Sequence, residues 1–597
     1  MIKDSQYRFD TFEDGKILHN KKKRRLPAMG WNSWNAFGSG NTEELTKAMA
    51  EKLIELGLAD LGYKYVVLDD GCYKPERVNG LLANEELKFP SGFRALADYM
   101  HRRGLKFGMY NDIGTNLCAG AAVGTCGHEE EDAKTYLSWA IDFLKVDNCY
   151  YLWDNATFSD EKNAKYVFAP NIRKLVLRRI DKTDSKDSDE LIYLATEGTV
   201  TGDRISIRDN YVTGIGTWDG TGPDRTPVGM QSSELLIDIN ILEDGEYEII
   251  LDYATGEEEG VGSFVQMTLV DGEKSEAIYD DFVRPTQSTE SFEENTIIKH
   301  YFKKGIYQLR IMNHRRQENT LGSYGILLEA LNRNDPDNDI ILSVCEWGKT
   351  GPQNWGYKVG DSWRILNDIT FQVGSDGDVG QGAWENDYTC SITSQYNKAV
   401  IMDEFAGLEK GWNDPDMMVI GMNGLSESMN KTHMTMWCMM NAPLMLGLDL
   451  RRISRGDEIW SIISNREMIA LNQDSLGIQA KRIYSTIKGE TGAYDRDYIR
   501  DNKRGDVLAK PLADGSIAVS FINLDKDNAV EFPEISADMI MEKIGNKMIN
   551  PERYYSAKSL ELTDLWNGKK TIVGGRSILA GKISPCENIT FRVEVKE

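Results

Sequence analysis

The chain has 597 residues, of which 41% are hydrophobic and 27% charged, and its formal net charge is −25. A chain of this length holds about three or four domains, and its apolar content is high enough for folded cores, which excludes wholesale disorder. An acidic surface repels phosphate backbones and anionic lipids, so we expect neither nucleic acid nor a membrane as a partner. The composition suits a protein that acts on a neutral substrate.

The N-terminal residues and the cysteines bear on the cellular location. Residues 1–25 contain no apolar run typical of a secretory signal, and no stretch approaches the roughly 18 apolar residues of a membrane helix. We therefore expect a cytoplasmic protein with residues 1–25 as a solvated leader, unless a signal has been removed. The eight cysteines show no CxxC spacing and the six histidines are scattered, so we expect neither a disulfide scaffold nor a structural zinc site.

From residue 26 to about 180, short apolar runs alternate with helical patterns. The segment Thr42–Leu58 has apolar residues at helical spacing, which predicts an amphipathic helix. Three apolar runs predict strands, and each ends in polar or acidic residues: Tyr65–Leu68 before Asp69 and Asp70, Phe107–Tyr110 before Asn111 and Asp112, and Phe143–Val146 before Asp147. Alternating strands and helices predict a parallel sheet, and we assign residues 26–190 to the first part of a (β/α)8 barrel.

Acidic residues at the ends of barrel strands have two interpretations. The active sites of such barrels form at the C-terminal ends of the strands, where an acid takes part in the chemistry. A strand-end Asp also commonly caps the helix that follows. The position of a single acid therefore leaves both interpretations open.

The pattern changes after about residue 181. Residues 181–190, DKTDSKDSDE, form a polar run that is typical of a linker. Residues 191–335 then show short alternating strands with regular turns, which predict an inserted β-sandwich: Leu235–Ile241, Tyr247–Leu251, Phe264–Val270 and Tyr307–Met312.

The barrel pattern resumes at Ile340–Val344, and we assign residues 336–477 to the second part of the barrel. Residues 478–597 are again rich in strands and predict a second β domain at the C-terminus. The strands are Asp506–Leu512, Ser516–Asn523 and Ile589–Val593.

Asp147 is the first candidate for a catalytic residue. It follows a buried strand, and Lys145, two residues earlier, lies on the same side of that strand. A nearby cation helps to keep a carboxyl group ionised, as a nucleophile must be. The alternative is a structural Lys–Asp pair.

Asp69 and Asp70 are suited to holding two sugar hydroxyls or a metal, or else to capping a helix.

Further acids follow in the second part of the barrel. Arg364 and Asp368 stand four residues apart, a spacing that is also common in surface ion pairs. Asp414 and Asp416 flank a proline. Two carboxylates facing each other across a polar pocket are the layout of glycoside hydrolysis, in which one is the nucleophile and the other donates and then accepts a proton.

Nine motifs, in order along the chain, carry a specific resemblance. They are MGWNSWNAFG (29–38), VVLDDGCY (66–73), FGMYND (107–112), LKVDNC (144–149), SVCEWG (343–348), SWRILNDI (362–369), GWNDPDMMVIG (411–421), NAPLMLGLDLR (441–451) and NQDSLGIQ (472–479). Over residues 26–180 and 336–597 the chain resembles the α-galactosidases of glycoside hydrolase family 27. The resemblance implies a retaining enzyme that needs no cofactor. The fold class is then α/β: a (β/α)8 TIM barrel, here with an inserted β-sandwich, and a C-terminal antiparallel β-sandwich.

The resemblance also implies the residues of the site. The nucleophile falls on Asp147 and the acid/base on Asp368, with Arg364 as a ligand of the sugar. Asp69 and Asp70 fall where the family holds the axial 4-OH and the 6-OH of galactose. The pocket is completed by Trp34, Tyr110, Lys145 and Asp416.

Glu346 matches the position that meets the sugar 2-OH in α-galactosidases, where related N-acetylgalactosaminidases have a small residue. This favours a terminal α-galactosyl unit of an oligosaccharide or glycoconjugate as substrate. Other glycones of the family stay open: those of α-N-acetylgalactosaminidase, β-L-arabinopyranosidase and isomaltodextranase. The alternative from another class, a non-catalytic carbohydrate-binding protein, is disfavoured by the intact set of acids.

The chain departs from the family pattern at its cysteines and in its insert. Cys118 and Cys149 match a pair that borders the sugar, and whether they are a disulfide or two thiols is left open. Gly71 displaces another family cysteine to Cys72, which has no partner near residues 34–39. The insert weakly resembles carbohydrate-binding modules of families 6 and 35, which often hold Ca²⁺. Sugar binding and a structural or oligomerising role both stay open for the insert. Whether the protein forms a homo-oligomer also stays open.

Overall fold

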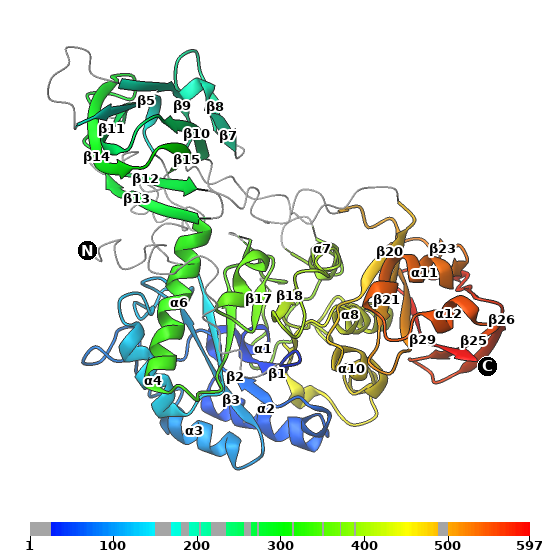
Figure 1. Ribbon diagram of the computed structural model, residues 1–597. Coiled ribbons are helices and arrows are strands. Elements are labelled where there is room, and N and C mark those ends of the chain that lie inside the picture. The colour runs from blue at the N-terminus through cyan, green and yellow to red at the C-terminus, as the bar shows by residue number, and fades with distance from the viewer. Residues whose placement is uncertain are drawn as a thin grey trace.

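The computed structural model describes residues 25–149, 169–180, 190–201, 205–215, 234–255, 264–271, 274–312, 316–348, 351–370, 372–386, 390–487 and 499–596. Figure 1 shows the barrel at the centre, the insert above it and the C-terminal domain beside it. Within the described residues, no helix is both long and apolar enough to span a lipid bilayer.

Eight parallel strands form the barrel sheet. They are β1 (Met29–Asn32), β2 (Tyr65–Val67), β3 (Lys106–Asp112), β4 (Phe143–Asp147), β16 (Ile341–Cys345), β17 (Ser362–Arg364), β18 (Trp412–Asp414) and β19 (Leu444–Leu446). From β1 to β18 each strand pairs with its neighbours in chain order, and β1 also pairs with β19. A parallel bridge between Met418 and Leu446 joins the segment after β18 to β19 and closes the ring. The predicted TIM barrel is confirmed.

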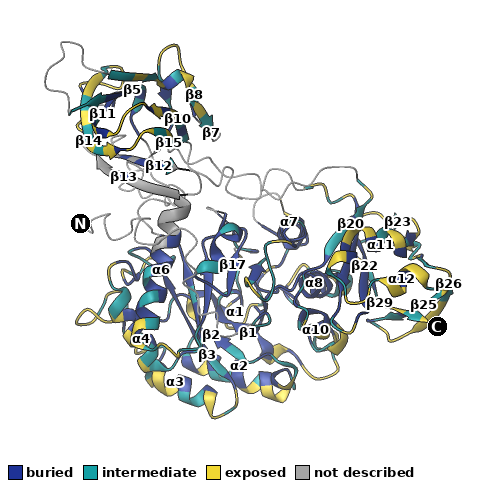
Figure 2. Cartoon of the chain, in the orientation of Figure 1, coloured by how far each residue is buried: buried dark blue, intermediate teal, exposed yellow. Residues whose placement is uncertain are grey.

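Helices surround this ring. The longer ones are α2 (Glu43–Glu55), α3 (Gly92–His101), α4 (Glu129–Trp139), α6 (Arg316–Asn334), α7 (Ile392–Ala399), α8 (Glu427–Met439) and α10 (Arg466–Asn472), and the shorter ones are α1 (Ser33–Phe37) and α9 (Glu458–Ile463). Helix α2 lies within the predicted segment Thr42–Leu58, and the Thr42 side chain caps it by accepting a hydrogen bond from Leu45 N–H at 3.2 Å. The barrel strands are buried, whereas α2, α3 and α4 expose their outer faces (Figure 2).

The insert is a sandwich of two antiparallel sheets. Its strands are β5 (Asn171–Arg179), β6 (Glu190–Leu194), β7 (Thr199–Thr201), β8 (Ser206–Ile207), β9 (Val212–Thr213), β10 (Glu234–Ile241), β11 (Gly245–Ala254), β12 (Phe264–Asp271), β13 (Lys274–Phe282), β14 (Glu293–Phe302) and β15 (Gly305–Met312). One sheet has the order β13-β12-β15-β10-β7 and the other β14-β11-β5-β9-β8, with β6 also paired to β5. Along β10, alternate residues point into the core, because successive side chains of a strand face opposite sides.

The predicted borders of the insert, residues 191–335, are wrong at both ends. Strand β5 precedes the polar run 181–190 and pairs with β6 and β11, so this run connects two strands of one sheet rather than two domains. Residues 181–189 themselves lie outside the described residues. At the other end, α6 belongs to the barrel, since Tyr324 OH donates to Val146 O of β4 at 2.8 Å. The insert therefore spans residues 171–312.

This correction defines where the insert leaves the barrel. It lies between β4 and α6 in the chain, so it replaces the connection that begins at the C-terminal end of β4. Asp147 is the last residue of that strand. The connections at this end of the strands build the active sites of (β/α)8 barrels, so the insert begins at the functional end of the barrel.

The C-terminal domain is antiparallel, as predicted. Its main sheet has the order β20 (Lys481–Ser485), β21 (Gly505–Pro511), β22 (Ile517–Asn523), β29 (Asn588–Lys596), β25 (Ser559–Asp564) and β26 (Lys570–Gly574). Two small sheets and two helices complete it: β23 (Val530–Glu531) with β28 (Lys582–Ile583), β24 (Ile535–Ser536) with β27 (Ser577–Ile578), α11 (Ala537–Ile544) and α12 (Glu552–Ser556).

Candidate active site

A cavity of about 230 Å³ is formed by residues at and just after the C-terminal ends of the barrel strands. It brings together residues of β3 and β4 with residues of the segments that follow β1, β2, β3, β4, β16, β17 and β18, which are far apart in the sequence. Its lining comprises Trp34, Asn35, Asp69, Asp70, Tyr110, Cys118, Ala119, Lys145, Asp147, Cys149, Trp347, Asp368, Val373, Asp416 and Met417. All the predicted site residues except Glu346 and Arg364 are in this lining.

Asp147 lies in the cavity wall and is 6% exposed. Its Oδ2 accepts a hydrogen bond from Tyr110 OH at 3.0 Å and lies 3.3 Å from Cys118 Sγ. Burial raises the pKa of Asp147 to about 6, against the opposing effect of the Lys145 ammonium. The sequence suggested that Lys145 would dominate, but desolvation outweighs it. Above pH 6 the carboxyl is still ionised, as a nucleophile requires.

Asp69 and Asp70 also belong to the polar lining. Asp69 Oδ2 accepts hydrogen bonds from Asn32 Nδ2 and Lys145 Nζ, each at 2.9 Å. The two oxygens of Asp70 accept the backbone N–H groups of Gly71 and Ala119, each at 2.6 Å. Burial raises the pKa of Asp70 to about 6.

Asp368 belongs to a second charged cluster, with Arg364 and Asp416. Arg364 Nη2 lies 3.0 Å from Asp368 Oδ1 and 2.8 Å from Asp416 Oδ2. The Asp368 side chain is 26% exposed, so it reaches the cavity, whereas the Arg364 side chain is 3% exposed and lies behind the two acids. Burial raises the pKa of Asp368, and the Arg364 charge opposes this rise. A raised pKa favours the protonated form that a general acid needs.

The structure does not bring Glu346 to the cavity. Its side chain is fully buried, and the next residue, Trp347, lines the cavity in its place. Trp347 has a left-handed backbone with φ of +59°, which turns the chain after β16. Glu346 is not among the lining residues, so its expected contact with a sugar 2-OH stays a prediction.

Five lining residues were not predicted. Trp347 and Met417 lie inside motifs that carry the family resemblance, and Ala119 follows Cys118, so these positions could have been found. Asn35 likewise lies inside a family motif, MGWNSWNAFG (29–38), whereas Val373 had no comparable signal. Val373 lies after β17 and enters the lining only through the course of its loop.

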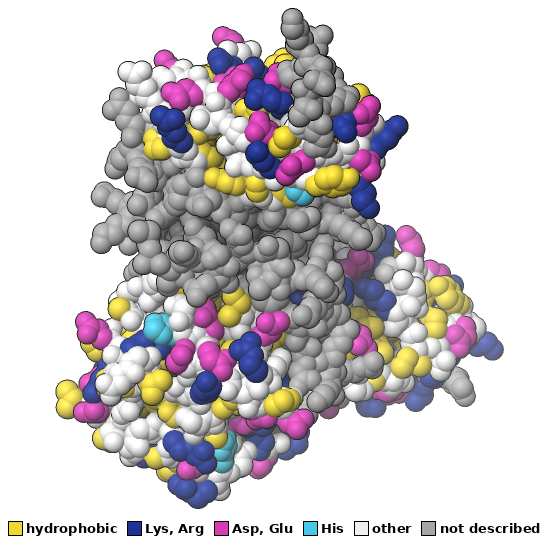
Figure 3. All heavy atoms as spheres, turned by 60° about the vertical axis from the view of Figure 1, so that its left-hand side comes forward, with side chains coloured by type: hydrophobic (Ala, Val, Ile, Leu, Met, Phe, Trp, Pro, Cys, Tyr) yellow, Lys and Arg dark blue, Asp and Glu magenta, His cyan; other side chains and the backbone are white. Residues whose placement is uncertain are grey.

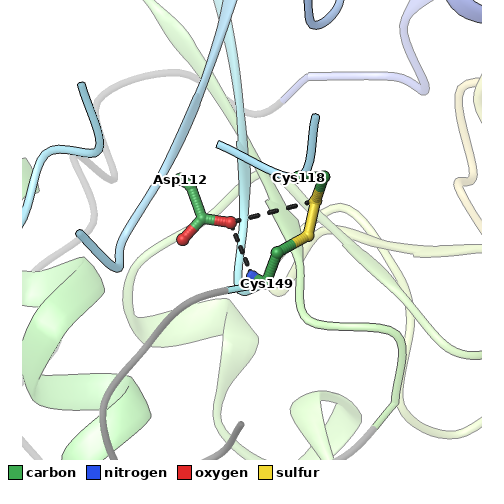
Figure 4. Close-up of side chains that lie close together, drawn as sticks. All are labelled: Asp112, Cys118 and Cys149. Atoms are coloured by element: carbon green, nitrogen blue, oxygen red, sulfur yellow. Dashed lines mark hydrogen bonds between the residues drawn. A yellow bond between two sulfur atoms is a disulfide. The ribbon is translucent and has the colours of Figure 1, made fainter. Parts of the chain in front are cut away.

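Cys118 and Cys149 form a disulfide, which the sequence left open, with their Cα atoms 5.3 Å apart. Figure 4 shows Asp112 beside it: Asp112 Oδ2 accepts a hydrogen bond from Cys149 N–H at 2.6 Å. Asp112 Oδ1 also accepts Gly114 N–H at 2.6 Å, so this carboxylate joins the ends of β3 and β4. Cys72 forms no disulfide, as expected.

The described residues give little support for a metal. The described part of the chain contains one group of three or more His, Cys, Asp or Glu residues whose possible ligand atoms all lie within 4.8 Å of one another. It consists of Asp112, Cys118 and Cys149. The disulfide engages both sulfur atoms. In the described part of the insert no such group occurs, and Ca²⁺ in this domain stays a prediction.

Comparison with known proteins identifies the family. A family model described as "Alpha galactosidase A" matches residues 26–175 and 302–474, and one described as "Alpha galactosidase C-terminal beta sandwich domain" matches residues 503–592. Residues 176–301, which are most of the insert, fall outside both matches.

Individual proteins agree with these matches. An alpha-galactosidase of Oryza sativa subsp. japonica is 27% identical over 464 residues, 77% of this chain and 66% of that protein. Alpha-galactosidase A of Cellvibrio japonicus is 25% identical over 551 residues, 91% of this chain and 86% of that protein. The crystal structure of alpha-galactosidase I from Mortierella vinacea shares the fold, with a TM-score of 0.59 and 22% identity over 96% of this chain and 98% of that one. The chain belongs to the alpha galactosidase A family, and it is a glycoside hydrolase that releases α-linked galactose.

Proposed function

We propose that Asp147 is the nucleophile and Asp368 the acid and base in the hydrolysis of terminal α-galactosyl units of oligosaccharides or glycoconjugates. The supporting observation is that both carboxyl groups line one cavity, although they lie more than 200 residues apart in the sequence. Burial raises the pKa of both carboxyl groups, and a nearby cation opposes the rise in each case, Lys145 for Asp147 and Arg364 for Asp368. Once Asp147 is ionised, its negative charge favours the protonated form of Asp368.

In the first step, ionised Asp147 attacks the anomeric carbon, and protonated Asp368 donates its proton to the leaving glycosidic oxygen. The Tyr110 hydroxyl, which donates to Asp147 Oδ2, stabilises the ionised carboxylate before the attack. The C–O bond to the leaving group breaks as the bond to Asp147 forms. The product is a glycosyl ester on Asp147.

In the second step, Asp368 is ionised and removes a proton from water, which attacks the same carbon from the side that the leaving group vacated. The bond to Asp147 breaks, and galactose leaves with its original configuration. This double displacement requires the two carboxyl groups to lie about 5–5.5 Å apart, and we keep that separation as a prediction.

The glycone is held by the polar half of the cavity. Asp69, Asp70 and Lys145 supply two carboxylates and an ammonium, which suit the 4-OH and 6-OH of galactose. Trp34 and Trp347 supply aromatic surface for the apolar C–H faces of the ring. No step of this chemistry requires a metal or an organic cofactor.

Within the cavity, Asp69, Asp70 and Lys145 support galactose over related glycones, whereas Glu346 is not in the lining. Hydrolysis of nitrophenyl α-galactoside, α-N-acetylgalactosaminide and β-L-arabinopyranoside, compared side by side, decides the glycone. We expect the highest kcat/KM for the α-galactoside. A higher value for another glycone would overturn the galactose assignment but not the two catalytic roles.

The test of the catalytic roles is the Asp147→Asn variant, which should lose turnover while still binding galactose. A slow fluorinated galactoside should trap a covalent adduct on Asp147 of the parent protein, identified by peptide mass spectrometry. Substantial turnover by a verified Asp147→Asn protein, or an adduct on another residue, would contradict the assignment. Galactose binding without turnover by the parent protein would favour the non-catalytic alternative.

For the insert, sugar binding remains a prediction. The outward face of its six-stranded sheet carries a row of ion pairs instead of an aromatic platform: Lys299–Glu248 at 3.7 Å, Arg178–Glu248 at 3.5 Å and Arg178–Glu190 at 2.8 Å. Charges of both signs are interspersed over the insert (Figure 3). Tyr301, at the end of β14, is 59% exposed and is an aromatic surface available to a sugar. Retardation of the full chain in gels containing galactan, abolished by Tyr301→Ala, would support sugar binding, and no retardation would favour a structural role.

A further inference from the structure

Asp416 has a left-handed backbone conformation at the edge of the active site. Its φ is +79°, in a region that residues other than glycine rarely adopt, because Cβ approaches the backbone carbonyl oxygen. The residue is buried, and its N–H donates to Asp414 Oδ1 at 2.8 Å. A strained conformation of this kind persists only where the surroundings hold it in place.

The side chain of Asp416 holds the segment that carries the general acid. Its Oδ2 accepts a hydrogen bond from Ile369 N–H at 2.8 Å and pairs with Arg364 Nη2 at 2.8 Å. Ile369 directly follows Asp368, and the same Nη2 atom lies 3.0 Å from Asp368 Oδ1. One carboxylate therefore positions Asp368 through its backbone and through its side chain. The direction of that carboxylate depends on the backbone conformation of Asp416.

Helix α8 holds the segment that contains Asp416 at two points. Trp437 Nε1 donates a hydrogen bond to the carbonyl oxygen of Asp416 at 2.8 Å. One turn earlier on the same helix, His433 Nε2 accepts Val419 N–H at 3.2 Å. The two rings lie against each other with their centroids 4.0 Å apart, and both side chains are fully buried. Burial lowers the pKa of His433 to about 3, so the ring is neutral and its Nε2 can accept.

We propose that Trp437 is a positioning residue for the general acid: it holds Asp416 in its left-handed conformation, and Asp416 in turn holds Arg364 and the segment at Asp368. Trp437 is not in the lining of the cavity, so it acts without touching the substrate. This inference rests on the proposed function, in which Asp368 is the acid.

A misplaced acid has a kinetic signature that general damage to the site lacks. The value of kcat/KM reports the first step, in which Asp368 protonates the leaving oxygen. Phenoxide needs that proton, whereas 2,4-dinitrophenoxide leaves without it. A variant that misplaces only the acid should therefore lose activity on phenyl α-galactoside and keep it on 2,4-dinitrophenyl α-galactoside.

The experiment measures both substrates with Trp437→Phe, which keeps an aromatic ring and removes only the N–H donor. We expect kcat/KM to fall about tenfold or more for the phenyl substrate and less than about threefold for the dinitrophenyl substrate, as for a partial loss of general acid catalysis. The alkaline limb of the pH profile should also move. Trp384→Phe is the matched control, because buried Trp384 Nε1 donates to Leu524 O at 2.9 Å away from the cavity.

A second pair of variants covers the case in which Trp437→Phe does not fold. His433→Leu removes the acceptor for Val419 N–H and should show the same dependence on the leaving group, whereas His433→Gln retains an acceptor and should resemble the parent. Circular dichroism and the urea midpoint establish that each variant is folded.

Asp368→Asn provides the reference that separates the two hypotheses. If it shows no dependence on the leaving group, the assignment of the acid fails, and this inference fails with it. If Asp368→Asn depends on the leaving group, but Trp437→Phe loses kcat/KM equally on both substrates or on neither, the inference alone is overturned. If Trp437→Phe does not fold, and His433→Leu and His433→Gln depend equally on the leaving group, the inference alone is again overturned.

Discussion

The ammonium group of Lys145 makes its shorter ion pair with Asp69: Nζ lies 2.9 Å from Asp69 Oδ2 and 4.0 Å from Asp147 Oδ1. The lysine therefore binds one carboxylate of the glycone site directly and acts on the nucleophile from a greater distance. This arrangement explains why burial can raise the pKa of Asp147 to about 6 although a cation lies nearby.

The first prediction concerns the pH dependence of kcat/KM. Activity requires ionised Asp147, so it should fall as the pH drops through about 6, and it should fall again at higher pH as Asp368 loses its proton. Lys145→Met removes a cation that favours the ionised form, so the acid limb should move to higher pH by roughly half a unit to one unit. Initial rates on nitrophenyl α-galactoside from pH 4 to 9 test this.

The control for this prediction is Lys481→Met, which removes a lysine that pairs with Asp403 at 3.3 Å outside the cavity lining. It should leave the acid limb where it is in the parent protein. An unmoved acid limb in Lys145→Met would show that another group controls it.

The second prediction concerns the loop that carries Cys118. Arg77 pairs with both oxygens of Asp132, at 2.6 and 2.8 Å, and donates to the carbonyl oxygens of Val123 and Gly124 in that loop. Arg77→Met leaves the buried Asp132 carboxylate without this partner, so the free energy of unfolding should fall by about 3–5 kcal/mol. Urea unfolding followed by circular dichroism measures it.

The paired variant Arg77→Met/Asp132→Leu removes both charges and should recover part of the lost stability, because no uncompensated carboxylate remains. Its kcat/KM should stay below that of the parent, since the same loop supplies the Ala119 N–H that holds Asp70. A double variant as unstable as Arg77→Met would argue against the buried ion pair as the cause.

The third prediction concerns Lys510, which is fully buried in β21 and donates to Ile478 O at 2.7 Å and to the Asn441 side chain. Burial lowers the pKa of Lys510 from 10.5 to about 7. Between these two values the unfolded chain binds a proton that the folded protein has released. The contribution of Lys510 to the free energy of unfolding therefore rises with pH across this window and is flat below pH 7.

Lys510→Met should remove this slope, so the difference in urea midpoint between variant and parent should change steadily from pH 7 to pH 9. Lys481→Met again serves as the control, because that side chain is partly exposed and should leave the pH dependence of the midpoint unchanged. A constant difference between Lys510→Met and parent would contradict the lowered pKa.

The fourth prediction concerns the disulfide beside the nucleophile. A non-reduced digest should contain Cys118 and Cys149 in one linked peptide pair, while Cys72 and the other unpaired cysteines react with maleimide after denaturation. Reduction should lower kcat/KM, because Cys118 Sγ lies 3.3 Å from Asp147 Oδ2. Mass spectrometry and initial rates before and after dithiothreitol test both statements.

The same measurement bears on the cellular location. A cytoplasmic location stays a prediction, and disulfides persist mainly in oxidising compartments. Protein isolated from its native cells with Cys118 and Cys149 linked would contradict the cytoplasmic prediction, and two free thiols would support it.

Local patterns were sufficient for most of the fold. Strand β10 alternates apolar and polar residues, and α2 has apolar residues on one face, so both were predictable from nearest neighbours along the chain. The border of the insert was not, since β5 pairs with β11 about 70 residues later and no local pattern reports that pairing. The polar run 181–190 has the composition of a linker, although it joins two paired strands.

The site shows the same division. The amino-acid sequence alone determined which residues are candidates for the chemistry, because the acids at the strand ends, Asp69, Asp70, Asp147 and Asp368, stand in motifs that a barrel places at one end. Only the tertiary structure decided which side chains share the cavity: it buries Glu346, turns Trp347 inward, places Arg364 behind Asp368 and holds Asp416 against Trp437. The physical reason is that burial, ion pairing and desolvation depend on groups that are distant along the chain and meet only when the ring of strands closes.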